Sequence, residues 1–215
     1  MKRMDEGMPF LLQYEHVAWY EDGKVRILDR RVYPREVRFE VCETYRQVVR
    51  AIADMVTQSA GPYTAVGMGM ALAAHQVRDK GRAEQLAFLR QAAQELAHAR
   101  PTTANRYGQI TFRCADVAEA ALEAGQNPVA AIVEDTLESL GRRYSVMQLV
   151  GDRLEALVPE GGTVLTQCYG ETIIGTLIRA ARRTGKSFRV FCAETRPFLQ
   201  GARLTASCFA QAGVD

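Results

Sequence analysis

In the first part of the chain, hydrophobic and polar positions alternate with a period of two before residue 44 and with helical spacing after it. Residues 14–20 and 24–29 flank the turn sequence Glu-Asp-Gly, and residues 36–41 alternate charged and apolar side chains with a period of two. Such alternation, broken by a tight turn, is typical of short antiparallel strands. From Thr44, a residue type favoured at helix N-caps, apolar residues recur with helical spacing as far as Val56. The pattern therefore predicts a small β extension before residue 44 and a helix after it.

The middle of the chain is dominated by helical patterns. Residues 59–76 carry three glycines among small apolar residues, which is typical of a buried helix and equally of a loop that leads into a ligand-facing helix N-terminus. Residues 82–98 are strongly amphipathic, and an alanine- and leucine-rich helical pattern continues to about Leu157. We therefore predict a β extension over residues 1–43 and a helical domain over residues 44–157.

The last part of the chain alternates strand and helix patterns. Predicted strands at 163–167 and 188–193 each precede a predicted helix, the first at 171–183 and the second from about Gly201. This order is the signature of a parallel sheet flanked by helices. The sequence thus predicts an α/β protein whose residues 158–215 form the first part of a doubly wound domain.

Composition and charge narrow the functional classes. The 215 residues are 47% hydrophobic and 24% charged, and the formal net charge of +2 is too small to indicate binding to nucleic acid or to an anionic membrane. The cysteines are five in number and form no CxxC pair, which argues against a disulfide framework or a zinc ribbon. No stretch approaches the ~20 apolar residues that span a bilayer. We expect a soluble, cytoplasmic protein with no metal site, no nucleic-acid partner and no membrane segment.

A thiol stands where the predicted strand 163–167 meets the following helix. Open parallel sheets bind ligands at the carboxyl ends of their strands, beside the N-termini of the following helices. The positive end of a helix that starts near Gly170 would favour an anion there and would help the Cys168 thiol to ionise, making it a usable base or nucleophile. The alternative is a small buried residue that merely fits the strand end. Glu194 and Arg196, directly after the second strand, point either into the same crevice or to a salt-bridged loop.

Several strings of the sequence resemble methylthioribose-1-phosphate isomerase and its relatives, which include ribose-1,5-bisphosphate isomerase and the regulatory subunits of initiation factor 2B. The most specific strings are VLTQC, AETRPFLQGARLTA and ARPTTANR, and weaker similarity covers nearly the whole chain. The resemblance implies a helical N-terminal domain with a β extension and a Rossmann-like C-terminal domain. It also implies a homodimer, no metal or nucleotide cofactor, and conversion of an aldose 1-phosphate to the ketose 1-phosphate.

The resemblance also implies roles for individual residues. Cys168 matches one member of a catalytic pair that moves protons between C1, C2 and the ring oxygen of the sugar. Arg100 matches a phosphate-contacting arginine, and the planar guanidinium suits that role because it can hold two phosphate oxygens at once. Gln200 matches a glutamine that contacts the substrate.

The chain departs from the family pattern near two of these positions. Cys168 is flanked by glutamine and tyrosine, where the family enzymes usually have histidine and asparagine. Gln58, Ser59 and Ala60 stand where the family has arginine, glycine and alanine before the glycine-rich stretch. This position therefore lacks one expected phosphate-binding cation, which suggests an altered substrate, and we expect the three residues to line the phosphate site.

The resemblance places the second catalytic group, an aspartate, on a strand that would follow Asp215, which itself aligns before that strand. We therefore expect residues 1–215 by themselves to be nearly inactive, unless Glu171 or Glu194 takes the place of that aspartate. Two functions stay open: a sugar-phosphate isomerase, and a non-catalytic regulatory or assembly protein of the initiation factor 2B type. The predicted site residues Cys168, Arg100 and Gln200 favour the isomerase, because a scaffold needs none of them. The absence of an arginine at the Gln58 position and of the distal aspartate favours the non-catalytic function for residues 1–215.

Overall fold

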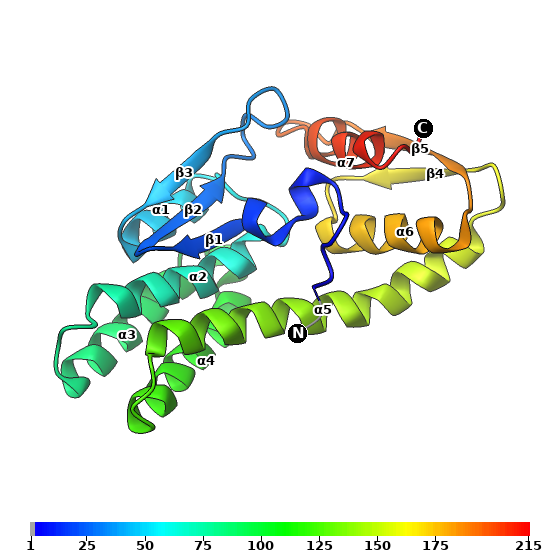
Figure 1. The fold of residues 1–215 in the computed structure, drawn as a ribbon. Helices are drawn as coiled ribbons and strands as arrows, with labels where there is room; N and C mark the ends of the chain where they lie inside the picture. The colour runs from blue at the N-terminus through cyan, green and yellow to red at the C-terminus, as the bar shows by residue number, and fades with distance from the viewer. Residues whose placement is uncertain (1–2) are drawn as a thin grey trace. The chain divides into compact units, whose positions relative to one another are not determined.

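The computed structural model describes residues 3–215, which form two compact units that interleave along the sequence (Figure 1). We call them the helical unit and the sheet unit. The helical unit comprises residues 17–29 and 38–139, and the sheet unit comprises residues 3–16, 30–37 and 140–215. The α/β class is confirmed, whereas the predicted domain boundaries after residues 43 and 157 stay predictions.

The helical unit contains the small antiparallel sheet that the alternating pattern predicts. Its strands are β1 (Ala18–Glu21), β2 (Lys24–Leu28) and β3 (Phe39–Cys42), in the order β1-β2-β3. Gly23 has φ +77°, a left-handed conformation that suits the tight turn between β1 and β2. The predicted strand at 14–20 is shorter than expected, because Tyr14–His16 form a 3-10 turn instead.

Helices form the rest of this unit. Their bounds are α1 (Tyr45–Ala53), α2 (Gly61–Gln76), α3 (Arg82–Ala97), a 3-10 turn η3 (Pro101–Thr103), α4 (Ala104–Glu123) and α5 (Pro128–Leu157), which continues into the sheet unit. Thr44 caps α1 through a capping box with Gln47, as its residue type predicts. The glycine-containing segment is a buried helix: a Cβ on Gly67 would lie 2.5 Å from the Thr136 hydroxyl, so glycine permits the close approach of α2 to α5.

The sheet unit contains the predicted parallel strand pair. The strands β4 (Gly162–Gln167) and β5 (Phe188–Ala193) are parallel neighbours, and α6 (Glu171–Thr184) connects them (Figure 1). After β5 the chain forms a short π-helix, η4 (Gly201–Thr205), and α7 (Ala206–Gln211). Within residues 3–215, none of the helices combines the length and the apolar character that a bilayer crossing requires.

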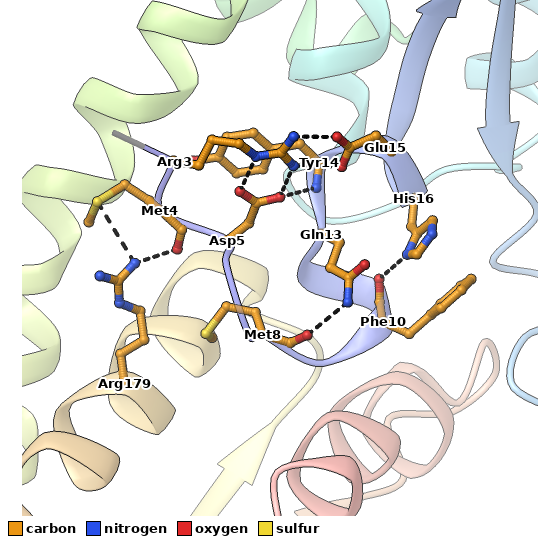
Figure 2. A network of polar contacts seen from close by, with 10 residues as sticks. All are labelled: Arg3, Met4, Asp5, Met8, Phe10, Gln13, Tyr14, Glu15, His16 and Arg179. Carbon is orange, nitrogen blue, oxygen red and sulfur yellow. Dashed lines mark hydrogen bonds and ion pairs between the residues drawn. The ribbon is translucent and has the colours of Figure 1, made fainter. Parts of the chain in front are cut away.

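The N-terminal segment of the sheet unit is held by polar contacts (Figure 2). The buried carboxylate of Asp5 accepts hydrogen bonds from the Tyr14 main-chain N–H at 2.8 Å and from Arg3 Nε at 2.9 Å. Burial, with the negative charge of Asp5 nearby, raises the pKa of Tyr14 to about 12. Arg179 of α6 donates to the main-chain carbonyl of Met4. The contact between Arg179 and Met4 attaches the described part of this N-terminal segment to α6, the helix that follows β4.

Candidate active site

Cys168 lies at the carboxyl end of a parallel strand, as the sequence predicts. It follows β4 directly, and Gly170 is the N-cap of α6. Its φ of +65° places a residue with a side chain in the left-handed region that favours glycine. Such a conformation costs about 1–2 kcal/mol for a non-glycine residue and persists only where surrounding contacts hold it. The thiol therefore occupies a strained turn between strand and helix.

Two threonine hydroxyls hold the main chain of Cys168. The N–H of Cys168 donates to Thr195 Oγ1 at 2.8 Å, and its carbonyl accepts a hydrogen bond from Thr205 Oγ1 at 2.6 Å. Sequence reasoning did not single out either threonine. Both stand in the AETRPFLQGARLTA string, but side-chain contacts with a residue 27 or 37 positions away leave no local pattern in a sequence.

Gln200 lies in the same part of the sheet unit. It directly precedes η4, and its side-chain amide oxygen is buried with no hydrogen-bond partner among the described residues. The next residue, Gly201, approaches the end of β5 so closely that a Cβ there would lie 1.8 Å from the Ala193 carbonyl oxygen and 3.2 Å from Thr195 Oγ1. The structure thus brings Gln200 to the loop whose threonine holds Cys168.

Arg100 lies in the helical unit, just before η3. Its Nε donates to the Ile52 carbonyl and its Nη2 to the Thr57 carbonyl, both at 2.8 Å. One carbonyl belongs to the last turn of α1, and the other lies in the loop between α1 and α2. Arg100 therefore has a structural role beside the phosphate contact that the family resemblance implies.

The predicted residues Gln58, Ser59 and Ala60 occupy that loop, at the N-terminus of the buried helix α2. Gln58 is buried, and its Nε2 donates to the Met55 carbonyl at 3.3 Å. Met55 and Ser59 have φ values of +61° and +58°, so the loop contains two strained turns. A loop before a helix N-terminus presents main-chain N–H groups and the positive end of the helix dipole, which favour an anion. Arg100 and this loop therefore form one group of candidate phosphate-binding residues.

The predicted residues thus fall into two groups, one in each unit. Cys168 and Gln200 belong to the sheet unit, and Arg100 with the loop before α2 belongs to the helical unit. The structure argues against Glu171 as a replacement for the family's aspartate, because its buried carboxylate pairs with Arg30 at 2.7 Å. Glu194 is exposed and pairs with Arg196 at 2.8 Å.

Three of the other four cysteines are buried. Burial raises the pKa of the Cys42, Cys114 and Cys208 thiols to about 12, so these three are unreactive at neutral pH. Cys168 and Cys192 are partly exposed. Across the part of the chain that the structure describes, no three His, Cys, Asp or Glu side chains are grouped so as to hold a metal ion.

Comparison with known proteins supports the family resemblance. The chain is 35% identical over 213 residues to a methylthioribose-1-phosphate isomerase of Desulforudis audaxviator, an alignment that covers 92% of this chain and 58% of that protein. The chain therefore spans somewhat more than half the length of the curated relatives it matches.

Two solved structures have the same fold. One is the delta subunit of the translation initiation factor eIF-2B from A. fulgidus, with a TM-score of 0.71 and 26% identity, covering 93% of this chain and 60% of that one. The other is 5-methylthioribose 1-phosphate isomerase from Pyrococcus horikoshii, with a TM-score of 0.71 and 25% identity, covering 93% and 58%. Residues 60–215 match the Initiation factor 2 subunit family, and because this match covers well over half of the sequence, the chain belongs to that family.

Proposed function

We propose that the protein is an aldose–ketose isomerase that converts an aldose 1-phosphate of the methylthioribose 1-phosphate type to the ketose 1-phosphate. The observation that carries this proposal is Cys168, a thiol held in a strained left-handed turn at the carboxyl end of a parallel strand. Non-glycine residues in this conformation cluster at functional sites, because a purely structural turn is more stable with glycine. The relatives named methylthioribose-1-phosphate isomerase supply the reaction class.

The chemistry requires groups that exchange protons with the sugar. The anomeric oxygen of an aldose 1-phosphate is esterified, so the ring cannot open freely as it does in a free sugar. Isomerisation breaks the bond between C1 and the ring oxygen, moves the C2 hydrogen to C1, and transfers the proton of the C2 hydroxyl to the ring oxygen. Cys168 is proposed as one of the groups that carry these protons, and Gln200 as a group that contacts the sugar hydroxyls.

The phosphate is proposed to bind at the N-terminus of α2. Arg100 and the main-chain N–H groups of the loop formed by Gln58, Ser59 and Ala60 would hold its oxygens. In line with the family resemblance, we also propose a homodimer in the cytoplasm that needs neither a metal nor a nucleotide cofactor and that serves methionine salvage.

The proposal is tested by incubating the purified full-length protein with methylthioribose 1-phosphate and following the reaction by ³¹P and ¹³C NMR. The full-length protein is used here and in the kinetic measurements below, because residues 1–215 by themselves are expected to be nearly inactive. We expect the ketose carbonyl signal to appear, and ribose 1-phosphate and ribose 1,5-bisphosphate serve as alternative substrates. A protein that binds these sugar phosphates in calorimetry but converts none of them would instead be a non-catalytic regulatory protein.

Arg100→Ala is expected to raise the KM for the sugar phosphate by about 10- to 100-fold, because a charge-assisted contact with the phosphate is lost. Steady-state kinetics and calorimetric titration with inorganic phosphate measure the effect. Since Arg100 also holds the Ile52 and Thr57 carbonyls, thermal denaturation is recorded alongside. Arg106→Ala is the control. Arg106 is an exposed arginine that donates to Gln109, and its substitution removes the same charge as Arg100→Ala. Equal phosphate affinity in the two variants would contradict the assignment of Arg100.

A further inference from the structure

We propose that Thr195 and Thr205 are positioning residues, which hold the Cys168 main chain in its left-handed conformation and thereby direct the thiol. This inference rests on the proposed function, because it gives the two threonines a purpose in the same reaction. Neither is proposed to touch the substrate. Their effect on the chemistry passes through Cys168.

The contacts of the two hydroxyls lie on opposite sides of the Cys168 Cα. Thr195 Oγ1 accepts the N–H on one side, and Thr205 Oγ1 donates to the carbonyl on the other. Both peptide groups that flank the Cα are therefore anchored, which fixes φ and ψ of Cys168 together. Because the direction of the Cα–Cβ bond follows from those two angles, the hydroxyls also determine where the thiol can lie.

Parallel pairing explains why Thr195 reaches Cys168. Gln167, the last residue of β4, is paired with Ala193, the last residue of β5, so the residues that follow the two strands emerge side by side. Thr195 itself has φ +61°, and its hydroxyl also donates to the Ala193 carbonyl at 3.2 Å. The Thr195 hydroxyl thus donates its proton to the carbonyl at the end of β5 and accepts a hydrogen bond from the Cys168 N–H.

The π-helix η4 explains why Thr205 reaches Cys168 from the other side. Gly201 packs against the Ala193 carbonyl oxygen at a distance that leaves no room for a Cβ, so η4 begins directly against the end of β5. The wider π-turn ends at Thr205, whose side chain is fully buried. A single turn of π-helix is rare and is often found at functional sites, where it redirects one side chain.

The arrangement makes the strained turn stable. A left-handed cysteine is unfavourable by itself, and the main-chain N–H and carbonyl of this partly buried turn are stabilised by hydrogen-bond partners. If either hydroxyl is removed, one main-chain group of Cys168 loses its partner and an extended conformation at Cys168 becomes competitive. The thiol would then leave its productive position, and a displacement of about 1 Å can lower a rate about 100-fold.

The test compares Thr195→Val and Thr205→Val with Thr195→Ser and Thr205→Ser, because valine keeps the shape of threonine and serine keeps its hydroxyl. Thr166→Val is the matched control, since the Thr166 hydroxyl donates to the Phe191 carbonyl at 3.3 Å within the same sheet. The first readout is the rate of alkylation of Cys168 by iodoacetamide relative to that of Cys192, resolved by peptide mass spectrometry. The second readout is kcat and KM of the full-length protein for methylthioribose 1-phosphate.

We expect each valine variant to change the alkylation ratio at least ~5-fold and to lower kcat about 10- to 100-fold with little change in KM. The serine variants are expected to restore both readouts to within about 3-fold of the wild type, and Thr166→Val to leave both unchanged. Valine variants that fold and keep the wild-type alkylation ratio would overturn the proposal. Wild-type protein without turnover, but with the expected changes in alkylation, would instead overturn the proposed function.

A second comparison does not need the valine variants to fold. Glycine adopts positive φ freely, so Cys168→Gly is expected to have a Tm about 2–4 °C higher than Cys168→Ala. An equal or lower Tm for the glycine variant would show that residue 168 is not held in a left-handed conformation, which would also overturn the proposal.

Discussion

Serine in place of Cys168 is expected to lower kcat for methylthioribose 1-phosphate by about 100- to 10,000-fold, the usual contribution of a positioned acid–base group. Serine has nearly the shape of cysteine and leaves the strained main chain in place, so the substrate should still bind. Its hydroxyl, however, gives up its proton far less readily than a thiol, and this removes the group that exchanges protons with the sugar. Steady-state kinetics, with substrate affinity from calorimetry, separate the two effects.

Cys192→Ser is the matched control for this variant. Cys192 lies in β5, the strand paired with β4, and is partly exposed like Cys168, but its main chain is part of the regular strand. We expect it to keep kcat within about twofold of the wild type. If Cys168→Ser and Cys192→Ser retained the same turnover, the thiol of Cys168 could not be a catalytic group.

Glu171→Gln is expected to destabilise the protein by about 3–5 kcal/mol, because it removes one charge of a buried ion pair with Arg30. The side chains of Arg30 and Glu171 are 0% and 1% exposed, and their charged atoms lie 2.7 Å apart. The Arg30 guanidinium also lies over the ring of Tyr169, 5.4 Å from its centroid. Burial lowers the pKa of Arg30, but the Glu171 carboxylate and the Tyr169 hydroxyl outweigh it, so the pKa is raised.

Urea denaturation at neutral pH measures the loss of free energy of unfolding, and Glu194→Gln is the matched control. Glu194 forms the same type of ion pair with Arg196 at 2.8 Å, but the side chains are 57% and 80% exposed. Exposed pairs contribute about 0–1 kcal/mol, so the control should lose less than ~1 kcal/mol. Equal losses for the two variants would mean that the Arg30–Glu171 pair is not buried in solution.

The buried pair also bears on the site. Glu171 is the first residue of α6 and lies three positions after Cys168, so its contact with Arg30 anchors the turn that carries the thiol. A carboxylate at a helix N-terminus is further favoured by the helix dipole. We therefore interpret Glu171 as a structural residue, in contrast to the catalytic replacement that its position in the sequence suggested.

Much of the fold could be predicted from the sequence, because local patterns dictate local elements. The period-two alternation over residues 36–41, the N-cap at Thr44 and the strand–helix–strand order after residue 162 each correspond to an observed element. The same patterns predicted the position of Cys168 at a strand end, because the hydrophobic period changes there from that of a strand to that of a helix. The pattern of residues 59–76 is compatible with a buried helix and with a loop that leads into a helix, so the sequence left the choice open. In the structure most of this segment is a buried helix, in which Gly67 packs closely against Thr136.

The chemistry around the thiol depends on contacts between distant residues, which local patterns do not record. The family resemblance pointed to Cys168, Arg100 and Gln200 because long strings of residues match. Only the tertiary structure decided that Cys168 has a left-handed main chain, that Thr195 and Thr205 hold it, and that Glu171 is neutralised by Arg30. The physical reason is that strain and a buried charge persist only where hydrogen bonds and counter-charges from other segments offset them, and the fold alone brings those segments together.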